Sequence, residues 1–254
     1  MVAGQPANVS ARGGFMLELH VFGPGFGLPD PSPFCVKAMI LMEMSGLPYR
    51  RVRGNLRKAP KGKFPVLVDD GEIVPDTSFI RLHLERKHGI DFDKGLSAEQ
   101  RGLAWAVEKM LEDHLYWQIV QERWANSANF DRGPRHFFNA VPGPLRPLVI
   151  AMVKREVRRN LHGHGIGRHS DEERLILARQ ALDSLSGLLG SKPYLTGPDP
   201  CGGDATFGAF MISGLCETFD SPLRGALTEH ANLVAYAGRM RDRYFKADAE
   251  AAPA

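Results

Sequence analysis

The sequence predicts a small mixed α/β domain followed by a larger all-α domain. Alternating and β-branched runs, which indicate strands, are confined to the first part of the chain. Helical periodicity dominates the remainder, and the polar segment 91–95 separates the two patterns. We therefore expect an α/β domain at 16–90 and a helical domain at 97–246. The tail over 1–15 lacks the apolar core of a signal peptide, and we expect it to be disordered.

The composition is that of an ordinary soluble globular protein. Of 254 residues, 43% are hydrophobic and 24% are charged, so each domain can bury its own core. The net charge of +3 is too small to favour nucleic acid as a partner. Three widely spaced cysteines suit a reducing compartment better than a disulfide framework. The apolar run 147–153 is too short to span a membrane, so we expect a cytoplasmic protein without a membrane partner.

The first strand, helix and second strand follow from local patterns. Residues 17–22 alternate in polarity and predict a strand, and residues 49–53 predict a second one. Between them, Ser32-Pro33 places a hydroxyl at the N-cap and a proline at the first position of a helix that ends at Gly46. The glycine- and proline-rich loop 23–31 lacks the spacing of a phosphate-binding loop, and its prolines remove amide donors.

The stretch from 63 to 80 organises the rest of this domain. Two β-branched runs flank Asp70-Gly71, which suits a type I′ hairpin turn. Pro65 directly precedes a central strand, where a cis peptide bond would explain its presence. Asp76 or Thr77 can cap the helix that follows and that stops at His88-Gly89. Strand, helix, strand, loop, two strands and helix form a thioredoxin-like order.

Helical patterns account for most of the second domain. An apolar stripe begins after a cap signal at Ser97 and continues to Ile119. Residues 126–147 are rich in Gly, Pro and Asn and are expected to form a long loop. Further helices are expected over 148–161, 171–189, 201–216 and 222–245.

Several residues allow more than one interpretation. Ser32 serves as an N-cap in any case, and a catalytic role can coexist with that. Cys35 has no cysteine partner at position 32, so it is expected to be a buried apolar residue and only as a minor alternative a reactive thiol. His162, His164 and His169 invite a metal site, but a turn between helices is the simpler interpretation.

Taken together, the motifs resemble the glutathione S-transferase family, in particular bacterial relatives of its failed axon connections and metaxin branch. The turn at 32–37 looks like the glutaredoxin Cys-Pro-x-Cys turn with serine in the first position. The resemblance covers nearly everything from Leu17 to Phe245. It is carried by segments 31–37, 60–63, 112–117, 161–170, 193–197 and 219–224. The chain departs from the family at Cys201, where the family has a hydroxyl cap, and this leaves a capping box with Asp204 in doubt.

The resemblance implies a glutathione transferase fold, glutathione as the bound cofactor, and roles for individual residues. Ser32 matches the catalytic hydroxyl. Phe64 before a cis Pro65 would hold the cysteinyl backbone of glutathione, and Asp76-Thr77 would hold its γ-glutamyl end. Further contacts are expected from Lys63 or Lys61 to the glycyl carboxylate, and from His114, Tyr116 and Trp117 to the second substrate.

Two functions remain open at this point. The first is conjugation of glutathione to a small electrophile by a detoxifying, cytoplasmic enzyme, expected to be a homodimer as is common in the family. The second is a non-catalytic binding or adaptor protein that keeps the fold, as some relatives in this branch do. Function resides in sites rather than in folds, so the sequence alone does not choose between them.

Overall fold

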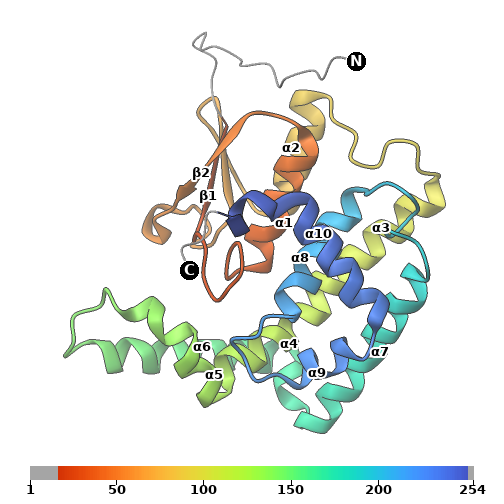
Figure 1. Ribbon diagram of the computed structural model, residues 1–254. Coiled ribbons are helices and arrows are strands. Elements are labelled where there is room, and N and C mark those ends of the chain that lie inside the picture. The colour runs from red at the N-terminus through yellow and green to blue at the C-terminus, as the bar shows by residue number, and fades with distance from the viewer. Residues whose placement is uncertain (1–16, 251–254) are drawn as a thin grey trace.

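The computed structural model describes residues 17–250, with side chains through residue 246. The tail expected over 1–15 lies outside the described residues. An α/β unit of four strands and two helices sits against a helical domain, and helices α5 (Ser127–Arg132) and α6 (Arg146–His164) project from the helical domain as an arm (Figure 1). No helix within residues 17–250 has both the length and the apolar character needed to cross a membrane.

The sheet has the expected thioredoxin-like order. Its strands are β1 (Leu17–Val21), β2 (Tyr49–Arg53), β3 (Val66–Asp69) and β4 (Glu72–Pro75), arranged β2-β1-β3-β4. The β1 strand runs parallel to β2 and antiparallel to β3, and β3 runs antiparallel to β4. Asp70 and Gly71 have φ of 59° and 85°, which confirms the predicted type I′ turn between β3 and β4.

Two capped helices pack against this sheet. Helix α1 (Pro33–Ser45) begins after Ser32 and ends at Gly46, whose φ of 67° is the left-handed conformation that glycine adopts readily. Helix α2 (Thr77–His88) begins after Asp76 and ends at Gly89. The two helices contact each other, and α1 also packs against α8 of the helical domain.

The helical domain contains more structure than the sequence predicts. The expected long loop at 126–147 is wrong in part, because it contains α5 and the 3-10 turn Pro134–Phe138. Asn126 caps α5 by accepting from the Asn129 amide at 3.0 Å, and buried Phe130 packs against Trp124 and Phe138. The domain comprises α3 (Ala98–Met110), α4 (Tyr116–Val120), α5 (Ser127–Arg132), α6 (Arg146–His164), α7 (Asp171–Leu189), α8 (Gly202–Gly214), α9 (Pro222–Thr228) and α10 (Ala231–Glu250).

The first helical stretch is longer than predicted, and the last predicted helix is divided. π-type turns at Leu111–Leu115 and Gln121–Ala125 join α3 and α4 and extend them into one long helical stretch. The last expected helix, over 222–245, is two helices, because the helical conformation is interrupted at residues 229–230 between α9 and α10.

Buried polar groups fix the helical core. Asp204 accepts hydrogen bonds from the amides of Leu195 and Cys201, both at 2.9 Å, and from the Tyr236 hydroxyl at 2.7 Å. A capping box needs two bonds, and the bond from the N-cap amide of Cys201 to the Asp204 carboxylate is present. Cys201 also donates its thiol to Asp204 at 3.3 Å.

A buried ion cluster joins the two domains. The Lys37 ammonium on α1 lies 3.0 Å from Glu108 and 2.6 Å from Glu112 of the helical domain. Lys37 and Glu108 are fully buried. Because removing one partner leaves a buried charge unpaired, such a cluster is a strong constraint on how the domains dock.

Candidate functional site

Three chain junctions meet at one end of the sheet. His20 near the end of β1 pairs with Val66 at the start of β3, and Val66 pairs with Pro75 at the end of β4. The loop leaving β1, the segment entering β3 and the segment leaving β4 therefore emerge side by side. We call this region the junction end of the sheet. It holds Ser32, Phe64, Pro65, Asp76 and Thr77.

The entrance to β3 has the expected backbone geometry. The Phe64–Pro65 peptide bond is cis, and both side chains are buried. The Phe64 ring covers Gly54, where an added Cβ would lie 2.1 Å from a ring atom. The same ring meets Phe22 edge-on with centroids 5.2 Å apart. Glycine at position 54 and the aromatic pair thus fix the main chain of Phe64 at the junction end.

Ser32 stands at the N-cap of α1 with a partly exposed side chain. Its oxygen accepts from the Cys35 amide at a long 3.5 Å, so the hydroxyl proton remains available to a bound ligand. The N-terminus of a 13-residue helix favours negative charge at this point. Cys35 is fully buried, and burial raises the pKa of its thiol well above the ordinary value. That thiol is therefore held in its unreactive form, as expected.

Two residues that the sequence analysis did not single out position Ser32. The buried Asp30 carboxylate accepts from the amides of Ser32 (2.8 Å), Gly23 (2.9 Å) and Phe22 (3.0 Å). Burial raises the pKa of Asp30 to about 6, against the lowering effect of these amides. From the helical domain, the buried Arg123 donates to the Pro31 carbonyl at 2.9 Å and to the Ser213 carbonyl at 2.6 Å.

Signals for these two residues were partly present in the sequence. An aspartate two positions before an N-cap serine in a proline-rich loop is suited to accept local amides. Arg123 gave no such signal, because its partners are about ninety residues away along the chain.

The start of α2 carries the acidic and hydroxyl pair. Asp76 caps the helix by accepting from the Ser78 amide at 3.0 Å, and its backbone has a φ of 86°, which is unusual for a residue other than glycine. Its side chain is exposed, whereas Thr77 is buried. Lys109 of the helical domain reaches the Ser78 hydroxyl at 3.1 Å. An exposed carboxylate and the first-turn amides of a helix together suit a zwitterionic ligand.

The basic loop before β3 is less constrained. Lys63 is exposed, and the Lys61 ammonium lies 4.7 Å from the centroid of the Phe79 ring. Phe79 on α2 is 55% exposed, and its ring faces the loop, where it contacts Lys61.

The three residues expected at the second substrate separate in the structure. The Tyr116 ring meets Phe34 of α1 edge-on at 4.9 Å, which places it at the domain boundary against the first turn of α1. Trp117 stacks on His164 at 4.7 Å and so faces the end of α6. His114 is partly buried. His164 also bonds the Asp113 carbonyl at 2.8 Å, which agrees with a turn between helices at this point.

An aromatic group adjoins the junction end and was not predicted. The Phe26 ring lies 5.5 Å from Phe137 and 5.3 Å from Phe219, measured between centroids. Phe22 lies 6.4 Å from Phe137, so the loop after β1 and the projecting arm contact each other through aromatic rings. Phe137 is 47% exposed and leaves apolar surface open beside the loop that leads to Ser32.

Two domain families match this chain in sequence. The glutathione S-transferase N-terminal domain matches residues 33–129, and the glutathione S-transferase C-terminal domain matches residues 178–240. Together these matches include the start of α1, the entrance to β3 and the start of α2, which form most of the junction end.

Individual proteins agree with these matches. The isoprene-epoxide glutathione S-transferase of Rhodococcus sp. (strain AD45) is 30% identical over 240 residues, covering 90% of this chain and 99% of that protein. Failed axon connections of Drosophila melanogaster is 31% identical over 243 residues, covering 91% of this chain and 58% of that protein.

A solved structure shows the same fold. The glutathione S-transferase of Methylobacterium radiotolerans, in complex with glutathione sulfonate, superposes with a TM-score of 0.58 at 20% identity, covering 92% of this chain and 93% of that one. Sequence similarity along nearly the whole chain, both domain matches and this shared fold lead to one conclusion: the chain belongs to the glutathione S-transferase family.

Proposed function

We propose that this protein binds glutathione at the junction end of the sheet and conjugates it to a small apolar electrophile. The observation that carries the proposal is the convergence of Ser32, the cis Phe64–Pro65 segment and Asp76-Thr77 in one place. As further parts of the proposal, the enzyme acts in the cytoplasm in a detoxifying role and as a homodimer.

Each part of the site suits one part of the tripeptide. The exposed Asp76 carboxylate suits the ammonium of the γ-glutamyl group, and the first-turn amides of α2 with the Thr77 hydroxyl suit its carboxylate. The Phe64 main chain suits the cysteinyl backbone. Lys63, which is exposed and directly precedes Phe64, would meet the glycyl carboxylate. Charge complementarity at both ends would orient the thiol between them.

Ser32 is then the residue at the reacting atom. Its hydroxyl would donate to the glutathione sulfur, and the N-terminus of α1 would favour thiolate over thiol. The thiolate would attack an electrophilic carbon and form a carbon–sulfur bond. For an epoxide, the carbon–oxygen bond would break, and the resulting alkoxide would take up a proton from solvent. The Asp30 and Arg123 contacts hold the loop that delivers this hydroxyl.

The second substrate should be small and apolar. Tyr116 is next to α1, and burial raises its pKa, so the phenol remains a hydrogen-bond donor at neutral pH. The exposed part of Phe137 extends the apolar surface. An epoxide is the first class to test, because the Rhodococcus relative is named for isoprene epoxide. Trp117 contributes less to the second-substrate site in this proposal, because its ring faces α6. The partly buried His114 is given a lesser role as well.

The test is a turnover assay with glutathione and a panel of electrophiles that includes aliphatic epoxides. Product formation that saturates in both substrates would support the proposal. Saturable glutathione binding without turnover on any electrophile would overturn conjugation and favour the non-catalytic binding protein. Absence of glutathione binding would overturn both conjugation and non-catalytic glutathione binding, and would leave an adaptor that retains only the fold.

A further inference from the structure

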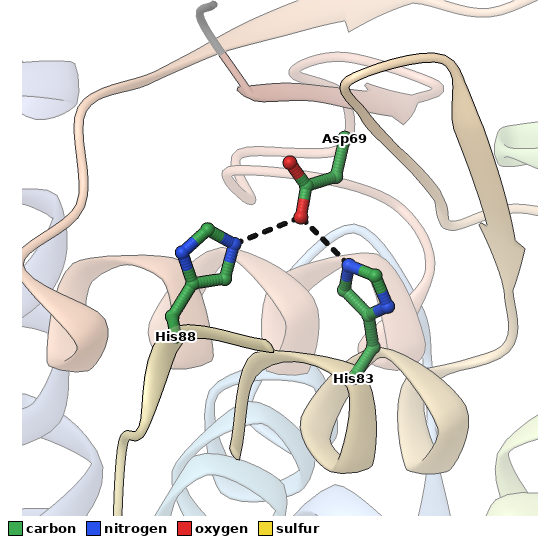
Figure 2. A group of neighbouring side chains, drawn as sticks. All are labelled: Asp69, His83 and His88. Carbon is green, nitrogen blue, oxygen red and sulfur yellow. Dashed lines mark hydrogen bonds and ion pairs between the residues drawn. The ribbon is translucent and has the colours of Figure 1, made fainter. Parts of the chain in front are cut away.

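A second cluster of chemically capable side chains lies at the opposite end of the sheet, by the β3–β4 hairpin. Asp69 is the last residue of β3, while His83 and His88 lie on the final turns of α2. Both imidazoles point toward one carboxylate oxygen (Figure 2). Asp69 Oδ2 is 2.7 Å from His83 Nε2 and 2.8 Å from His88 Nε2. We call these three residues the clasp.

The clasp has the composition of a cation site. Within the side chains that the structure describes, it is the one group of three or more His, Cys, Asp or Glu residues whose ligand atoms all lie within 4.8 Å of one another. Two imidazole nitrogens and one carboxylate oxygen form a donor set that suits Zn²⁺ and neighbouring divalent transition metals. The His88 side chain is 24% exposed, which leaves a route for an ion and a position for water.

A separate observation at His83 points to a ligand. Its Nδ1 atom is buried and has no hydrogen-bond partner, although the Glu72 carboxylate lies 3.5 Å away. With the proton on Nε2 and donated to Asp69, Nδ1 presents a lone pair to a carboxylate, which is unfavourable. A cation on Nε2 would displace that proton to Nδ1, where it would face Glu72. Metal-bound histidines commonly donate their other nitrogen to a carboxylate in this way.

Lys87 is the competing cation. Its ammonium lies 3.2 Å from the other Asp69 oxygen and 3.3 Å from the Asp69 carbonyl. The side chain is 33% exposed and can swing into solvent, and it does not occupy the oxygen that both histidines contact. Lys87 should therefore weaken cation binding without blocking it.

We propose that Asp69, His83 and His88 bind a divalent transition metal of the Zn²⁺ type, with water in the remaining position and Glu72 as an outer partner of His83. The bound ion would tie the end of α2 to the β3–β4 hairpin. Its role is structural, because the clasp lies at the far end of the sheet from Ser32 and Pro65. The proposal is independent of the proposed conjugation.

The experiment titrates Co²⁺ into the full-length, chelator-stripped protein and follows the visible absorption of tetrahedral cobalt. Glutathione is left out, because its own thiol binds metals. We expect a band that saturates at one equivalent and is bleached by Zn²⁺. His88→Gln should weaken the apparent affinity at least about tenfold. His162→Gln, at an exposed histidine far from the clasp, should leave it unchanged. Lys87→Met should tighten binding.

Two results would overturn the proposal. One is the absence of a saturating band, or a band that His88→Gln leaves unchanged, which would show only adventitious binding. The other comes from ¹⁵N NMR of the histidine rings. If His83 carries protons on both nitrogens at neutral pH and Zn²⁺ does not change this, the unpaired Nδ1 is explained by an imidazolium between Asp69 and Glu72. Circular dichroism of each variant checks that the fold is retained.

Discussion

The two ends of the four-stranded sheet are built from the same strands but differ in how their polar side chains are paired. At the hairpin end, Asp70-Gly71 forms a tight turn, and the Asp69 carboxylate is contacted by two histidines and a lysine. At the junction end, Asp76 holds an unusual φ, and the Ser32 hydroxyl accepts from the Cys35 amide at a long 3.5 Å. Backbone strain and unused hydrogen-bonding capacity gather where ligands bind. The difference fits the two proposals, in which the junction end binds glutathione and the hairpin end binds a structural cation that ties α2 to β3 and β4.

The largest expected effect is the loss of conjugation in Ser32→Ala. Removing a donor aimed at the reacting sulfur should lower kcat/KM by about 10²–10³, by analogy with the loss of an oxyanion-hole donor. The N-cap loss should also lower the free energy of unfolding by about 1 kcal/mol. Ser170→Ala is the matched control, since Ser170 caps α7 in the same way at an exposed site. Equal kcat/KM in wild type and Ser32→Ala would remove the proposed role of this hydroxyl.

Asp30 should make stability depend on pH in the acid range. Its pKa is about 6 in the folded protein, raised by burial from an unfolded value near 3.8. The folded state therefore binds more protons between these values, and this group's contribution to stability falls as pH rises from about 4 to 6. Between pH 4 and 6 the free energy of unfolding of wild type should therefore fall by roughly 2 kcal/mol relative to that of Asp30→Asn. Chemical denaturation at several pH values measures it, and parallel curves for the two proteins would contradict the assignment.

Gly71→Ala should affect the hairpin end of the sheet and leave the junction end unchanged. Gly71 has a φ of 85°, so an alanine there should destabilise the hairpin by about 1–2 kcal/mol. Glutathione affinity should not change, because the junction end is at the other end of β3 and β4. Thermal unfolding and calorimetric titration of the same variant test both statements. A weakened glutathione affinity at full folding would show that the two ends are coupled.

Local signals account for what could be predicted from the sequence. Asp-Asp-Gly between β-branched runs, proline before a strand and hydroxyl or acidic caps before apolar periodicity each act within a few residues. The hairpin, the cis Pro65 and the bounds of α1 and α2 therefore agree with the structure. The loop expected at 126–147 was wrong because its glycines and prolines hid the Asn126 cap and the burial of Phe130.

Contacts between distant segments could not be predicted in the same way. Arg123 reaches Pro31 across the domain boundary, and nothing near either residue indicates this. The resemblance placed Trp117 at the second substrate, but its stacking on His164 depends on where α6 lies. The clasp was likewise missed, because Asp69 and the two histidines meet only once the hairpin packs beside α2.

The central claim is that the junction end binds glutathione, and calorimetric titration tests it most directly. The titration compares wild type with Asp76→Ala and Asp76→Gly. Both variants lose the carboxylate, but glycine adopts a φ of 86° without strain, so it separates ligand contact from backbone distortion. We predict saturable binding in wild type and at least about tenfold weaker binding in both variants, since a charge-assisted contact is worth about 1.5–3 kcal/mol. Wild-type affinity in Asp76→Gly, or no binding by the wild-type protein, would contradict the account.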